Sequence, residues 1–91
     1  MTCRIERLVV DDSSVVFRVS GRIEGENVTT LQGLLEHTTG EVALDLKEVT
    51  LVDRHAVSLL ALCERSGVEL QNLPAYLREW ISKEQAQIQG E

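Results

Sequence analysis

Residues 15–20 place Val15, Phe17 and Val19 on one side and Val16, Arg18 and Ser20 on the other, which is the pattern of a strand with one buried face. We predict strands over residues 5–10 and 15–20, separated by a turn sequence at residues 11–13. Because this connection is short, the two strands should form an antiparallel hairpin. Gly21 is expected to end the second strand.

From about residue 26 the spacing of apolar residues becomes that of a helix. Asn27 is a candidate cap for its start, and residues 38–40 close it. Gly33 lies inside the pattern and weakens it by about 1 kcal/mol relative to Ala, although it suits close packing on a sheet. The apolar stripe consists of Val28, Leu31, Leu34 and Leu35.

A mostly apolar strand over residues 42–46 suits a central place in the sheet. A short turn and the pair Leu51-Val52 lead to Asp53, whose carboxylate is placed to cap the next helix. That helix should end at Gly67, before a short strand over residues 68–71. Pro74 then suits the first position of a last helix. The inner stripe of that helix is Leu77, Trp80 and Ile81.

The predicted order is β-β-α-β-α-β-α. Crossovers through helices imply parallel pairing, and the hairpin adds antiparallel pairing. We therefore predict an α/β fold with a mixed β-sheet and helices mainly on one face. Ninety-one residues hold a single core, so residues 1–82 form one domain. Residues 83–91 lose the apolar stripe and are predicted to be a frayed C-terminal tail.

Composition excludes several classes of function. The net charge of −6 disfavours both nucleic acid and anionic membrane surfaces as partners. No apolar run approaches the roughly 20 residues that span a bilayer, and the N-terminal sequence lacks the apolar region of a signal peptide. We therefore expect a cytoplasmic protein without direct membrane insertion.

The sequence offers no catalytic or metal-binding signature. Cys3 and Cys63 are far apart and belong to no CxxC pair, and a zinc site with His37 and His55 would require four distant segments to converge. No nucleophile has a neighbouring base, and no Gly-rich loop is followed by Lys-Ser/Thr. We predict a non-enzymatic protein without metal or cofactor.

Three segments resemble the STAS domains of sulfate-transporter tails and anti-sigma-factor antagonists, over about residues 15–81. The first, VSGRIEGENVTTL, has the strand, the Gly-Arg pair with an acidic residue, and the first helix of the family. The second, VALDLKEVTLVD, has its hydrophobic-Asp-hydrophobic strand, short turn and closing Asp. The third, GVELQNLPAYLREWI, matches the last strand, the Asn-x-Pro-type connection and the last helix.

The resemblance implies a regulatory protein as partner, such as an anti-sigma factor or a serine-kinase-like protein. Family antagonists are phosphorylated on a Ser or Thr directly after the Asp that corresponds to Asp53. Here that position is Arg54, which has no hydroxyl group, so we predict that the phosphorylation switch is absent. The predicted partner-binding residues are Arg22, Glu24, Gly25, Asp53, Arg54, His55 and Val57.

Other interpretations stay open from the sequence. Thr50 and Ser58 are weaker candidates for phosphorylation, and a structural role is the alternative for each. Arg54 and His55 at a helix start also fit a small anionic ligand or nucleotide. The chain could further be a STAS subunit of a membrane transport complex, or a purely structural paralogue. The sequence does not determine the oligomeric state.

Overall fold

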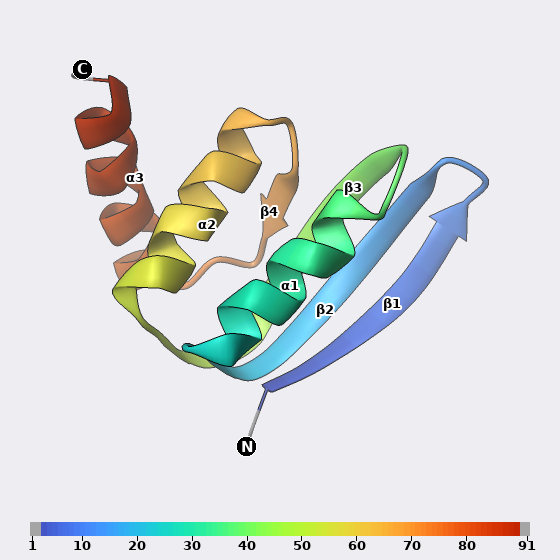
Figure 1. Cartoon of the computed structure of the whole chain (residues 1–91), viewed down its shortest axis with the longest axis horizontal. Helices are drawn as coiled ribbons and strands as arrows, with labels where there is room; N and C mark the ends of the chain where they lie inside the picture. Colours follow the sequence, from blue (N-terminus) through green and yellow to red (C-terminus); the bar gives the residue numbers. More distant parts are fainter. Residues whose placement is uncertain (1–2, 90–91) are drawn as a thin grey trace.

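The computed structural model describes residues 3–89, and it forms one four-stranded sheet with three helices (Figure 1). The elements are β1 (Cys3–Asp11), β2 (Ser14–Ile23), α1 (Glu26–Glu36), β3 (Glu41–Val52), α2 (Arg54–Arg65), β4 (Glu69–Gln71) and α3 (Ala75–Gln89). Their order confirms the predicted β-β-α-β-α-β-α sequence of elements. The strands lie in the order β1-β2-β3-β4, with β1 and β2 antiparallel and the other neighbours parallel.

The core lies on the side of the sheet that α1 and α2 cover (Figure 1). On β2 the alternate residues Val15, Phe17 and Val19 point into it, as the period of a strand requires. The central strand β3 adds Leu44 and Leu46. The helices contribute Val28, Leu31, Ala56, Val57, Leu60, Ala61, Leu77 and Ile81. Within residues 3–89 the opposite face of the sheet carries no helix, which confirms that the helices lie mainly on one face (Figure 1).

Three strands are longer than the sequence predicted. β1 spans residues 3–11, where a strand over residues 5–10 was predicted. β2 continues through Gly21, whose φ of 88° is a conformation that glycine adopts readily, and ends at Ile23. β3 runs without a break from residue 41 to residue 52, so no turn separates its halves. Irregularities in the β2–β3 register absorb the extra residues of β3. The expected turn is therefore a bulged part of the strand, and β3 delivers its end directly to Asp53.

The last helix differs from the expectation in its length and in the position of Trp80. α3 continues past Lys83 to Gln89, and Glu84 and Gln85 of the predicted tail bond to α2. Glu84 accepts a hydrogen bond from Ser58 at 3.0 Å, and the Gln85 side-chain amide donates one to Glu64 at 2.7 Å. Residues 90–91 lie outside the described part of the chain. Trp80 was predicted to face inward, yet 37% of it is exposed.

Gly33 does not serve close packing, contrary to what the sequence suggested. A Cβ atom built at this position meets no atom within 4 Å, and the residue has an ordinary helical backbone. The glycine therefore weakens α1 without a compensating contact.

We predict that Gly33→Ala raises the free energy of unfolding by about 0.5–1 kcal/mol, because alanine loses less backbone entropy in a helix. Urea denaturation followed by circular dichroism measures this difference. Gly40→Ala is the control and should destabilise the protein, since Gly40 has a φ of 88° and its added Cβ would lie 2.5 Å from the Ser13 carbonyl oxygen. An unchanged or lowered stability of Gly33→Ala would contradict the prediction.

Candidate functional site

Asp53 joins the starts of α1 and α2. Its Oδ1 atom accepts a hydrogen bond from the Ala56 N–H at 2.8 Å, which is the predicted N-cap of α2. Its Oδ2 atom accepts a second hydrogen bond, from the Gly25 N–H at 3.1 Å. The Asp53 N–H in turn donates to the Ile23 carbonyl at 3.2 Å. One residue therefore holds together two segments that lie 28 positions apart.

These contacts favour the ionised form of Asp53. Partial burial opposes its negative charge, but the N–H groups of Ala56 and Gly25 and the nearby His55 favour it more strongly. Together they hold the pKa of the carboxyl below its usual value. The negative charge also lies at the positive end of the α2 dipole, where it is favourable.

The segment from Arg22 to Gly25 forms the other half of this junction. Gly25 occupies the N-cap position of α1. Its backbone has φ 56° and ψ −127°, a conformation that glycine adopts readily and that would be strained for other residues. Asn27 was the expected cap, but its side-chain amide instead donates to the Arg22 carbonyl at 3.1 Å. This bond closes the segment on itself.

The surface at this junction mixes both signs of charge with one apolar side chain. Arg22 and Glu24 are exposed beside each other, with 3.8 Å between their nearest charged atoms. Arg54 and His55 are exposed in the first turn of α2. The structure adds Leu51, which pairs with Arg22 across β2 and β3 and is 41% exposed. Alternation along the strand could have predicted this, since Val52 points inward.

Val57 does not belong to this surface. Its side chain is completely buried in the core, so it supports the start of α2 from below and has no exposed atoms to offer a partner. We use the name junction surface for the remaining predicted residues together with Leu51: Arg22, Glu24, Gly25, Asp53, Arg54, His55 and Leu51.

A shallow groove leads away from the junction surface between α1 and α2. Its volume is about 440 Å³. Gly25 and His55 stand at the end nearest the junction, and Leu59 and Leu62 provide apolar contact area farther along α2. Leu62 is 52% exposed. The groove therefore continues the junction surface with an apolar strip, an arrangement suited to protein contact.

Two solved structures resemble this arrangement of elements. The anti-sigma factor antagonist SpoIIAA in its unphosphorylated form has a TM-score of 0.68 at 16% identity, over 87% of this chain and 82% of that one. The chain has the STAS-domain fold. An antisigma-factor antagonist STAS domain from Rhodobacter sphaeroides has a TM-score of 0.56 at 18% identity, over 77% of this chain and 84% of its own. No family model and no curated protein matches the sequence.

The remaining candidate residues lie outside the junction surface. Thr50 is exposed on β3. Ser58 donates its hydroxyl hydrogen to Glu84 of α3 at 3.0 Å, which is a structural contact. Cys63 is buried, and burial raises the pKa of its thiol to about 11, so it is protonated at neutral pH. Among residues 3–89, no three His, Cys, Asp or Glu side chains gather as metal ligands, and no helix is long and apolar enough to span a membrane.

We predict that Asp53→Ala lowers the free energy of unfolding at neutral pH by about 1–2 kcal/mol, because the cap and the bond to Gly25 are both lost. The folded pKa of Asp53 lies below the unfolded value of about 3.9. Its charge therefore stabilises the protein fully above the unfolded pKa, and this contribution disappears as the pH falls through the folded pKa. Urea denaturation at several pH values measures the difference from wild type.

Glu24→Ala is the matched control, since Glu24 is an acid of the same junction whose ion pair with Arg22 is exposed and long. Its effect on stability should stay within about 0.5 kcal/mol. A destabilisation by Asp53→Ala that stays constant down to acidic pH would show that the carboxylate charge has no such role.

Proposed function

We propose that this protein is a non-enzymatic regulatory module that binds another protein, such as an anti-sigma factor or a serine-kinase-like protein, through the junction surface. The observation that supports this most directly is the double hydrogen bond of Asp53. Because it joins Gly25 and Ala56, residues from two loops present one surface of fixed shape. The STAS fold of two antagonists supports the same class of function.

Charge indicates what the partner carries. The chain has a net charge of −6, yet Arg22, Arg54 and His55 gather at the junction. A partner surface with a carboxylate opposite Arg54 would gain attraction there, while the acidic remainder of the chain would repel a uniformly acidic partner. Leu51 provides the apolar contact area that a stable interface requires.

Arg54 also bears on regulation. It is the first residue of α2, exposed, and directly follows the capping Asp53. A phosphate added to a hydroxyl at this position would bring about two negative charges to the interface. Arg54 has no such hydroxyl, so we propose that binding is not switched by phosphorylation at this position.

A small anionic ligand has weaker support as a second function. An anion at the start of α2 would need the free N–H groups of its first turn. The Asp53 carboxylate already takes the Ala56 N–H and places its own negative charge there. A role as a STAS subunit of a membrane transport complex belongs to the class of protein binding, and the same surface would serve it.

We predict that immobilised wild-type protein retains a specific partner from lysate of its source, and that Arg54→Glu reduces this affinity by at least about tenfold. Quantitative mass spectrometry of the retained proteins measures the difference. Arg65→Glu is the matched control, because it makes the same charge reversal at the far end of the same helix. Equal retention by all three proteins would contradict the assigned surface.

We further predict that an anti-sigma-type serine kinase does not phosphorylate the wild-type chain, whereas Arg54→Ser becomes a substrate. The variant restores the Asp-Ser pair that the family's phosphorylated members carry. Intact-mass spectrometry after incubation with ATP detects the added phosphate. Stoichiometric phosphate on wild type would refute the absence of the switch, and Thr50→Ala and Ser58→Ala variants would then identify the acceptor.

A further inference from the structure

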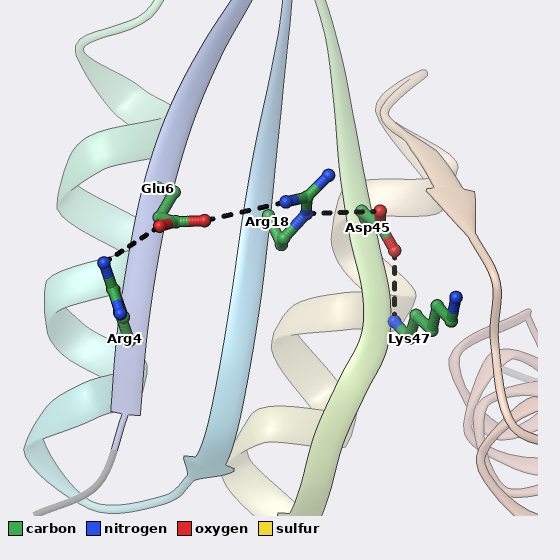
Figure 2. A network of polar contacts seen from close by, with 5 residues as sticks. All are labelled: Arg4, Glu6, Arg18, Asp45 and Lys47. Atoms are coloured by element: carbon green, nitrogen blue, oxygen red, sulfur yellow. Dashed lines mark hydrogen bonds and ion pairs between the residues drawn. The ribbon is translucent and has the colours of Figure 1, made fainter.

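A row of alternating charges crosses the open face of the sheet, away from the junction surface (Figure 2). Arg18 on β2 lies between Glu6 of β1 and Asp45 of β3, with N–O distances of 3.8 Å to each carboxylate. Asp45 also accepts hydrogen bonds from the Asn72 side chain at 3.0 Å and the Lys47 N–H at 3.1 Å. The row therefore reads negative, positive, negative from the interior of the sheet to its edge.

The row ends at an edge that could accept another strand. β1 is the outermost strand beside β2, and among residues 3–89 no strand pairs with its other side. Arg4 and Glu6 lie on the open face at this edge, 3.1 Å apart, with 77% and 37% of their side chains exposed. An unpaired edge strand presents free N–H and C=O groups that another strand can bind.

In the regular part of β1, over residues 3–7, the charges favour one way of pairing the strand with itself. Two residues that face each other in an antiparallel pair have their side chains on the same face of the sheet. When a strand pairs with a copy of itself about a two-fold axis perpendicular to the sheet, that axis must therefore pass beside one residue, which then faces its own counterpart. An axis through Glu6 would place the two Glu6 side chains opposite each other, and an axis through Arg7 would do the same with Arg7. Like charges directly opposite are unfavourable.

An axis through Ile5 places Arg4 opposite Glu6 of a second copy, twice, and Ile5 opposite Ile5. This pairing uses residues 3–7, which lie on the regular part of β1. The β1–β2 register shifts between Val9 and Asp11, so the bulged end of the strand stays outside the contact.

We propose that β1 pairs antiparallel with β1 of a second copy about an axis at Ile5, joining two four-stranded sheets into one of eight strands. The charge row then continues across the axis, since Glu6 lies between its own Arg18 and Arg4 of the second copy. The alternating order of charge is thereby extended over both copies. The contact involves no residue of the junction surface.

Analytical ultracentrifugation over a wide concentration series tests the proposal. Wild type should form dimers, whereas Arg4→Glu and Glu6→Arg should each weaken dimerisation at least about tenfold, because each sets like charges opposite. Mixing the two variants should restore a one-to-one dimer, since all facing charges are then opposite. Arg54→Glu makes the same charge change at the junction surface and should leave the dimer intact.

Glu6→Arg places a cation beside Arg18, so circular dichroism must first show that this variant is folded. If Glu6→Arg is not folded, Arg4→Lys replaces it as the second variant of the experiment. Arg4 is mostly exposed, and Arg4→Lys should keep the dimer that Arg4→Glu loses. A monomeric wild type overturns the proposal, and so does a dimer that Arg4→Glu leaves unchanged. If Arg4→Glu and Glu6→Arg are both folded but form no mixed dimer, the proposal is also overturned.

Discussion

The two hydrogen bonds accepted by the Asp53 carboxylate are the constraint on which the candidate site depends. Ala56 fixes the start of α2, and Gly25 fixes the start of α1, so one side chain determines how two loops lie against each other. The N-cap residue of α1 is a glycine and has no side-chain cap of its own. Arg54 and His55 therefore face outward from a helix start whose position is set by an ionised carboxylate.

The sheet brings Asp53 and Gly25 together. β2 and β3 are parallel neighbours, so the chain leaves both strands at the same end, where both helices begin (Figure 1). The completely buried side chains of Ile23 and Val57 anchor the two exits in the core. The buried residues of the strands and helices therefore stabilise the fold, whereas the exposed residues of the two loops are not needed for packing and are available for binding.

Local chemistry was predictable from the sequence, and long-range contacts were not. The capping role of Asp53 follows from its place before a helical pattern, whereas its bond to Gly25 depends on the pairing of β2 with β3. Residues 47–50 suggested a turn, but β3 accommodates them through register shifts. The loss of the apolar stripe after Lys83 predicted fraying, yet polar bonds from Glu84 and Gln85 to α2 extend the helix. Helix spacing alone cannot show such bonds.

A pH titration followed by NMR at the amides of Gly25 and Ala56 tests the central role of Asp53 most directly. If one carboxylate binds both amides, their chemical shifts should change with the same midpoint, below the ordinary aspartate value of about 3.9. Both titrations should vanish in Asp53→Asn. Different midpoints, or a Gly25 amide that does not respond, would show that Asp53 does not join the two loops.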